Sequence, residues 1–145
     1  MIDTITVQVA TKQSDIDQCF SIREHVFIDE QGVSKDLERD FHDNSAIHLL
    51  LKSNHEPIGA ARMRILDQKG KIERVCVLTP FRNKGFGEQF MRKVEEIGSE
   101  KGICELVLNA QEPALDFYLR LGYQKESERF YEAGIPHFAM KKRLR

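Results

Sequence analysis

The sequence is short of the features that mark secreted, zinc-binding and membrane proteins. Its 145 residues include no tryptophan and three cysteines, Cys19, Cys76 and Cys104. An odd number of widely spaced cysteines without a Cys-x-x-Cys pair predicts reduced thiols, and it argues against a disulfide framework or a zinc site. The first residues lack a basic stretch followed by an apolar run, and no apolar run approaches the roughly 20 residues that span a bilayer. We therefore expect a cytoplasmic protein without a metal and without a membrane partner.

A surplus of either charge is also absent. Lys and Arg number 22 and Asp and Glu number 23, which gives a formal net charge of −1. Proteins that hold nucleic acid over a large surface carry a basic excess, so this balance argues against a nucleic-acid partner. The basic ending at 141–145 fits a solvated strand end better than a binding patch. The length and the 41% hydrophobic content predict one domain over residues 1–145.

Hydrophobic periodicity in the first half predicts a strand, a helix and an antiparallel meander. Residues 4–9 alternate polar and apolar types, and apolar residues then recur at helical spacing over 16–27 behind a Ser14-Asp15 cap. The charged stretch 31–45, broken by Gly32, predicts a loop with a short helical turn. Three strands follow, and the first two are joined as a hairpin. Their predicted ranges are 46–52, 58–66 and 71–78.

The second half alternates helices with strands. An amphipathic helix is predicted over 87–101 and a second helix over 112–121, with Gly102 and Gly122 as their C-terminal stops. Strands are predicted over 103–109, 123–130 and 137–144. A meander followed by this alternation predicts a mixed α+β fold, in which helices cover a mixed, mostly antiparallel sheet.

The segment Arg82-Asn83-Lys84-Gly85-Phe86-Gly87 lies between a predicted strand and a predicted helix. The first amides of a helix lack internal partners and lie at the positive end of the helix dipole, which favours a phosphate there. Gly85 and Gly87 remove side chains that would block the approach, while Arg82 and Lys84 add positive charge. The segment has neither the residue order of a P-loop nor the third glycine of a dinucleotide fingerprint. It predicts a pyrophosphate cradle, although a plain glycine-containing turn with solvated cations has the same composition.

Three motifs together resemble the GNAT superfamily of acyl-CoA N-acyltransferases. Residues 82–87 match its Arg/Gln-x-x-Gly-x-Gly/Ala motif, residues 106–110 are similar to its fifth strand, and residues 118–123 are similar to its Tyr-x-x-x-Gly-Phe/Tyr signature. The order and spacing match over nearly the whole chain. Segments 23–32 and 134–137 further resemble the small bacterial ElaA-like and YjcF-like branch of this superfamily.

This resemblance implies a sheet that splays between its fourth and fifth strands, with the pantetheine arm of acetyl-CoA in the gap. Backbone groups of Val75, Cys76 and Val77 would pair with that arm like an added strand, and the Val77 amide would stabilise the oxyanion. Segment 82–87 would hold the pyrophosphate. The implied reaction is direct attack of a primary amine on the thioester, which yields an acetylated amine and coenzyme A without a metal.

Individual side chains also receive roles. Tyr118 is the expected proton donor to the leaving sulfur, since an unperturbed phenol has a pKa of about 10; without the resemblance, a core aromatic is the simpler interpretation. Asn109 is expected to contact the pantetheine arm or to cap the next turn. Glu73 shares a strand face with Val75 and Val77 by period-two alternation, so it is expected to be the base or to pair with neighbouring cations.

The acceptor side is defined by fewer residues. His137 is the alternative base because imidazole titrates near neutral pH, or else it lines the acceptor pocket. Glu30 and Arg23 are expected on the acceptor side from the family resemblance. Arg62 and Arg64 alternate with apolar neighbours, which predicts an exposed strand face or a contact to an anionic acceptor.

An enzyme is not the only function that fits these motifs. A non-catalytic acyl-CoA-binding sensor would need the same cradle but neither Tyr118 nor Glu73, and Tyr118 at the family's position favours the enzyme. A nucleotide-binding switch would need a P-loop lysine-serine pair and a magnesium site, which the sequence lacks. The donor site does not specify whether the acceptor amine belongs to a small molecule or a protein, and the sequence allows a homodimer.

Overall fold

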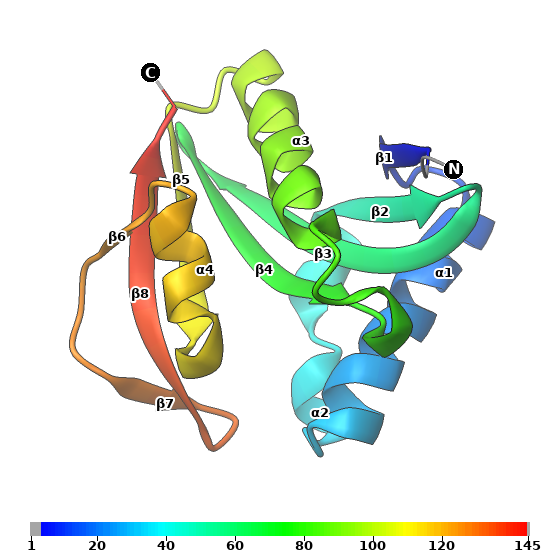
Figure 1. Cartoon of the computed structure of the whole chain (residues 1–145), viewed down its shortest axis with the longest axis horizontal. Coiled ribbons are helices and arrows are strands. Elements are labelled where there is room, and N and C mark those ends of the chain that lie inside the picture. The colour runs from blue at the N-terminus through cyan, green and yellow to red at the C-terminus, as the bar shows by residue number, and fades with distance from the viewer. Residues whose placement is uncertain (1–3, 145) are drawn as a thin grey trace.

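The computed structural model describes residues 4–144, which form one twisted eight-stranded sheet with helices on both faces (Figure 1). The strands are β1 (Ile5–Val9), β2 (Ile47–Ser53), β3 (Glu56–Leu66), β4 (Lys69–Val77), β5 (Glu105–Gln111), β6 (Gln124–Lys125), β7 (Phe130–Glu132) and β8 (Ile135–Arg143). They lie in the order β1-β2-β3-β4-β5-β8-β6, and β7 pairs with β8 beside this path. All strand pairs of the described residues are antiparallel except β4 with β5. The structure therefore confirms the mixed α+β fold.

In the described residues, four α-helices, one π-helical segment and three 3-10 turns connect the strands. They are α1 (Gln13–Arg23), the π-helical η1 (Glu24–Glu30), α2 (Lys35–Glu38), the 3-10 turn η2 (Phe41–Asn44), the 3-10 turn η3 (Thr79–Phe81), α3 (Phe86–Glu100), the 3-10 turn η4 (Glu112–Ala114) and α4 (Leu115–Arg120). Within the described part of the chain, no helix has the length and apolar character needed to cross a membrane.

The first helix begins and continues differently from the prediction. Its N-cap is Lys12, whose side chain makes no capping hydrogen bond, and Ser14 already lies inside the helix. Beyond Arg23 the chain continues without a break as η1. In the predicted loop that follows, the side chains of Ser34 and Asp40 accept hydrogen bonds from the amides two residues on. These caps explain why that loop holds α2 and η2.

The strand predicted over 123–130 is broken into β6 and β7, with residues 126–129 between them. The Ser127 hydroxyl accepts a hydrogen bond of 2.9 Å from the Ala139 amide on β8. A side chain that takes over a backbone donor interrupts the regular ladder, so the pairing with β8 restarts only at Phe130. The last strand, β8, also begins two residues before its predicted start.

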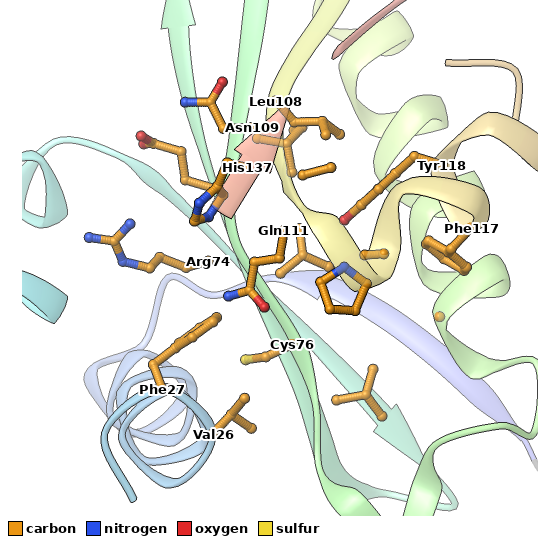
Figure 2. Close-up of a pocket in the computed structure, with 18 of the residues that line it drawn as sticks. Val26, Phe27, Arg74, Cys76, Leu108, Asn109, Gln111, Phe117, Tyr118 and His137 are labelled. Carbon is orange, nitrogen blue, oxygen red and sulfur yellow. The ribbon is translucent and has the colours of Figure 1, made fainter. Parts of the chain in front are cut away.

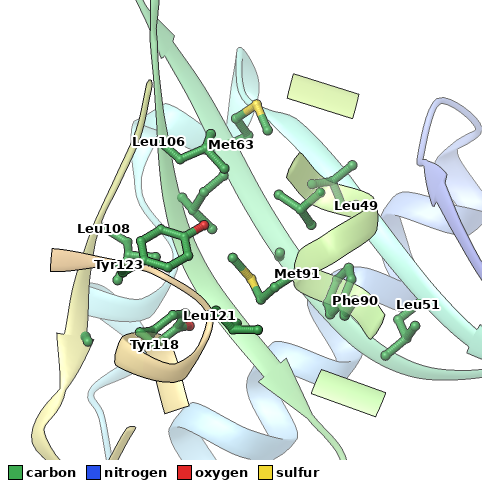
Figure 3. Packing of buried hydrophobic residues seen from close by; sticks show 14 of the residues in the cluster. Leu49, Leu51, Met63, Phe90, Met91, Leu106, Leu108, Tyr118, Leu121 and Tyr123 are labelled. Carbon is green, nitrogen blue, oxygen red and sulfur yellow. The ribbon is translucent and has the colours of Figure 1, made fainter. Parts of the chain in front are cut away.

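The two faces of the sheet pack against different helices. On one face Phe90, Met91 and Val94 of α3 are fully buried against strand residues that include Leu49 and Leu106 (Figure 3). The other face is covered by α1 and η1, and its apolar cluster consists of Ala10, Cys19, Ile22, Val26, Phe27, Leu50, Ala60 and Cys76. Burial of apolar surface on both sides stabilises the sheet. The cavity described next lies where β4 and β5 part.

Candidate active site

A cavity of about 900 Å³ opens between β4 and β5 (Figure 2). The two strands pair in parallel from Lys69–Glu105 to Ile72–Leu108 and make no further pair in the described residues. The β5-facing edge of β4 therefore has no strand partner from residue 73 onward. Backbone N–H and C=O groups on such an edge can pair with an extended ligand that carries amides. This is the splay that the resemblance implies, and its volume suits a small-molecule site, which is typically about 300–1,000 Å³.

The first turn of α3 lies at the rim of this cavity and is open to solvent. Gly85 is the N-cap of α3 with φ of +83°, and nothing lies within 4 Å of the position that its Cβ would take. A residue with a side chain would be strained in this conformation and would cover the helix amides. The exposed Lys84 lies beside it. An open helix N-terminus with a cation beside it has the chemistry that favours an anion.

Gly87 has a structural reason that the sequence did not predict. A Cβ at this position would lie 3.3 Å from the Phe117 ring of α4. Gly87 therefore allows α3 and α4 to pack closely beside the cavity.

Arg82 does not extend freely toward a phosphate in this structure. Its two terminal nitrogens each donate to the Glu30 carboxylate at 2.9 Å, and its Nε donates to the Val77 carbonyl at 2.7 Å. The hydrogen bond from Arg82 lowers the pKa of Glu30. Glu30, expected on the acceptor side, thus holds the loop of the predicted cradle, and a phosphate would have to compete with it for the guanidinium.

Tyr118 projects from α4 with its hydroxyl toward the cavity (Figure 2). Its ring packs edge-on against Phe117 and Tyr123, with centroids 5.0 and 5.5 Å away. Burial raises the pKa of Tyr118, so the phenol is protonated at neutral pH. The hydroxyl makes no hydrogen bond to another described residue, which leaves its proton available to a ligand.

A β-bulge in β4 makes the predicted direction of Glu73 wrong. Beyond the Arg62–Glu73 pair the register shifts by one residue, at Arg74, whose φ is +59°. One extra residue reverses the alternation of a strand. Val75 and Val77 consequently pack with the α3 cluster, while Glu73 lies on the α1 face with Arg62.

The Glu73 carboxylate is already held by cations. It accepts hydrogen bonds of 2.8 Å from both Arg62 and Arg64, and the Lys71 ammonium lies 3.8 Å away. Burial alone would raise the pKa of Glu73, but hydrogen bonds from Arg64 and the charge of Arg62 outweigh it and hold the pKa below its usual range. This setting matches the alternative of pairing with cations and makes Glu73 a weak proton acceptor at neutral pH.

Arg23 and Arg62 are both wholly buried. The predictions that Arg23 contacts the acceptor and that Arg62 lies on an exposed strand face are therefore wrong. Arg23 donates to Glu38 and Asp43 at 3.0 and 2.8 Å, and Arg62 donates to Asp40 and Asp43 at 2.7 and 3.0 Å. These carboxylates belong to α2, η2 and the turn between them, which the sequence predicts as loop. Neither arginine lines the cavity. Because protein carboxylates take up their guanidinium groups, Arg23 ties that segment to α1 and Arg62 ties it to β3.

The β5–β8 side of the cavity holds Asn109 and His137, together with a glutamate that sequence reasoning missed (Figure 2). Asn109 donates to Oε1 of Glu132 at 2.8 Å, and Nδ1 of His137 lies 2.7 Å from the Ile135 carbonyl oxygen. Oε2 of Glu132 lies 4.0 Å from Nε2 of His137. Glu132 directly precedes the predicted Ala133–Pro136 turn, and no motif in the sequence marks it.

Two glutamines join the walls of the cavity, and the sequence did not single them out either. Gln31 follows η1 and Gln111 ends β5, 80 residues apart in the chain. Their side-chain amides exchange hydrogen bonds of 2.9 and 3.3 Å. A lone glutamine carries no pattern from which such a partner can be inferred.

The remaining chemistry of the cavity is limited. Burial raises the pKa of Cys76 to about 12, so its thiol is protonated and is not a nucleophile at neutral pH. Within residues 4–144, no cluster of three or more His, Cys, Asp and Glu side chains could hold a metal ion. The arrangement brings together an open helix N-terminus, an open strand edge, a buried phenol and an imidazole along one cavity.

Known proteins match the chain in both sequence and fold. A family model described as an acetyltransferase (GNAT) domain matches residues 9–144. Two Bacillus subtilis proteins are each 38% identical to the chain: YyaT, described as an uncharacterized protein, over 97% of both chains, and YjcF, described as an uncharacterized N-acetyltransferase, over 92% of this chain and 96% of its own. A solved structure from Lactobacillus plantarum and that of Escherichia coli ElaA superpose with TM-scores of 0.91 and 0.83. Both are 25% identical and cover 97% of this chain and 99% of their own.

Proposed function

Because the chain belongs to the GNAT acetyltransferase family, in a small bacterial branch of it, we propose that it transfers an acetyl group from acetyl-CoA to a primary amine. The amine nitrogen attacks the thioester carbon directly. A bond forms between nitrogen and carbon, the carbon–sulfur bond breaks, and the sulfur leaves as coenzyme A after taking a proton. We place this reaction in the cytoplasm and assign it no metal.

The observation that carries the proposal is the unpartnered edge of β4 between the open N-terminus of α3 and the Tyr118 hydroxyl. The β4 edge at Val75, Cys76 and Val77 offers backbone partners for the pantetheine amides. Segment 82–87 receives the pyrophosphate on its amides near Gly85, with Lys84 as the free cation. In this arrangement Arg82 shapes the loop through its bonds to the Val77 carbonyl and to Glu30.

Direct attack requires a group that stabilises the oxyanion and a proton donor for the leaving sulfur. We propose the Val77 amide for the first role and Tyr118, which donates a hydrogen bond and then its proton, for the second. Of the two candidate bases we favour His137, since arginines hold Glu73 as a carboxylate on the opposite face from Val75 and Val77. Asn109 remains a proposed contact of the pantetheine arm, although its side chain is bonded to Glu132.

Calorimetric titration of acetyl-CoA into the protein, with NAD and ATP as controls, tests the donor site. We expect selective binding of acetyl-CoA, and we expect Gly85→Glu to weaken it by about 100-fold or more, since several charge-assisted hydrogen bonds are lost. Gly102→Glu is the matched control, because Gly102 has φ of +81° and open space around it at the other end of α3. Equal affinities of the two variants would overturn the assignment of the cradle.

A non-catalytic acyl-CoA sensor is the second candidate. The observation that favours it is that Arg62 and Arg64 already bind the Glu73 carboxylate, which makes this predicted base a weak one. A thiol-release assay with a panel of small amines and lysine peptides separates the two functions. Release of coenzyme A that depends on an amine supports the enzyme, whereas tight binding without release in the whole panel supports the sensor.

A further inference from the structure

His137 presents one ring nitrogen to the cavity as a hydrogen-bond acceptor. Its side chain is only 9% exposed, and Nδ1 lies 2.7 Å from the Ile135 carbonyl oxygen. A carbonyl oxygen can only accept, so Nδ1 carries the hydrogen and donates it. In the neutral ring, Nε2 is therefore an acceptor, and it has no hydrogen-bond partner within the described residues. The Phe130 ring stacks at 6.0 Å and keeps the imidazole in this orientation.

Glu132 presents a second acceptor at the same place. The Asn109 amide donates to its Oε1 at 2.8 Å and so fixes the direction of the carboxylate. The other oxygen, Oε2, lies 4.0 Å from Nε2 of His137, which is too far for a direct hydrogen bond. Two acceptors thus face each other at the cavity wall without a donor between them.

We propose that this pair of acceptors is the position at which the acceptor substrate docks its primary ammonium group. The inference rests on the proposed function and adds to it the amine-binding residues. A primary ammonium has three N–H groups, of which one can donate to Glu132 and one to His137. Without a donor, the two acceptors repel each other. A bound ammonium would instead donate a charge-assisted hydrogen bond to each of them. An acceptor with a carboxylate or phosphate next to its amine would be repelled by Glu132.

The same contact prepares the amine for attack. One N–H bond of the ammonium breaks and its proton moves to Nε2 of His137, while the electron pair stays on the amine nitrogen. The imidazolium that forms is stabilised by the Glu132 carboxylate and by the Ile135 carbonyl. The neutral amine then attacks the thioester, the second proton that leaves the nitrogen restores the Tyr118 phenol that has protonated the sulfur, and His137 returns its proton to solvent. Glu132 accordingly binds the substrate, and His137 is the base.

Nuclear magnetic resonance of protein with ¹⁵N-labelled histidine tests this position without turnover. The probe is n-butylammonium chloride at constant ionic strength, and tetramethylammonium chloride, which has the same charge but no N–H, is its control. We expect the Nε2 resonance of His137, assigned by its loss in His137→Gln, to shift with n-butylammonium and to saturate. Glu132→Gln should weaken the apparent affinity by about tenfold or more, as for a lost hydrogen bond to a charged group. Glu126→Gln is the matched control, since Glu126 pairs with Lys141 on the β6–β8 edge, outside the cavity lining.

The outcomes separate this inference from the function on which it rests. An equal shift with tetramethylammonium, an unchanged response in Glu132→Gln, or no response of the wild type overturns the docking position. If acetyl-CoA binds in calorimetry while any of these results is found, the proposed function stands and the inference alone falls. If acetyl-CoA does not bind, the proposed function falls. With an amine that the wild type acetylates, we expect Glu132→Gln to raise KM more than it lowers kcat, and His137→Gln to lower kcat.

Discussion

Two carboxylates line the same cavity from opposite halves of the sheet, and their surroundings differ. Glu73 on β4 has a side chain 16% exposed and accepts hydrogen bonds from Arg62 and Arg64. Glu132 on β7 is 50% exposed and is held by a single amide, that of Asn109. The first carboxylate has all the partners it needs within the protein. The second has one oxygen that accepts no hydrogen bond from any residue in the range 4–144.

This difference indicates that the two halves of the sheet have different roles in the candidate site. A buried carboxylate that is neutralised by arginines fixes the position of neighbouring segments, and its low pKa makes it a weak base. A carboxylate with a free oxygen beside an unpartnered imidazole can still bind a cation from solution. We therefore infer that β4, together with Arg62 and Arg64 of β3, supplies the frame of the site and that the β7–β8 hairpin supplies the contact to the acceptor.

The largest expected effect comes from removing Arg62, which joins the carboxylates around Glu73. Arg62→Met would leave Asp40, Asp43 and Glu73 close together without the cation that joins them. Removal of one partner of a buried ionic cluster typically destabilises a protein by about 3–5 kcal/mol. We expect a loss of this size in the free energy of unfolding, measured by urea denaturation. The control is Arg92→Met, which removes an exposed pair with Glu88 on α3 and should change stability by less than about 1 kcal/mol.

Lowering the pH should reduce the stability that the same ionic cluster provides, more gradually than the substitution of Arg62. Although burial opposes it, hydrogen bonds and charges of Arg23, Arg62 and Arg64 hold the pKa values of Asp40, Asp43 and Glu73 below their usual ranges. Groups whose pKa is lower in the folded state stabilise it above the unfolded pKa, and this contribution is lost as the pH falls through the folded pKa. Urea midpoints should thus be constant from pH 7 to about 5 and fall below about pH 4. A fall that persists unchanged in Arg62→Met would contradict this origin.

The fold could be predicted from the sequence because its signals are local. The α3 pattern, the glycines after α3 and α4, and the hairpin of β2 and β3 are each specified by residues close together in the chain. The break between β6 and β7 could not be predicted, because it depends on Ser127 meeting Ala139 of another strand. Likewise, the alternation of polar and apolar residues in β3 shows that Arg62 points to the opposite face from its apolar neighbours. It does not show that α2 and η2 cover that face.

Residues of the candidate site could be predicted where they belong to a sequence motif. They could not be predicted where only the tertiary structure brings them together. The cradle at Gly85 and the role of Tyr118 were predicted from motifs that resemble those of the GNAT superfamily, and both residues line the cavity. The direction of Glu73 was wrong because the bulge places a positive φ at Arg74, a residue type that gives no warning of it. Glu132 and His137 come together through the β7–β8 hairpin, whose register no local pattern specifies.

The contrast between satisfied and unsatisfied groups extends to two buried tyrosines. The Tyr123 hydroxyl donates to Glu95 at 3.3 Å, whereas the Tyr118 hydroxyl has no partner among the described residues. We expect Tyr118→Phe to lower kcat by about 10- to 100-fold, the low end for general acid catalysis, because its raised pKa makes the phenol a weak acid. The affinity for acetyl-CoA should be unchanged. Tyr123→Phe is the control and should leave kcat as it is, so equal rates of the two variants would remove Tyr118 from the mechanism.

The smallest expected effect concerns Asn109, where two roles make opposite predictions. If its amide serves to direct Glu132, then Asn109→Ala frees the carboxylate and weakens the ammonium response of His137 by about three- to tenfold, the size of the net contribution of one ordinary hydrogen bond. The affinity for acetyl-CoA should then stay constant. If its amide instead binds the pantetheine arm, acetyl-CoA affinity falls by a similar factor and the ammonium response does not change. Gln124→Ala, which removes an exposed amide from β6, should change neither quantity. Measuring both affinities in the same preparation therefore decides whether Asn109 belongs to the acceptor side or the donor side of the cavity.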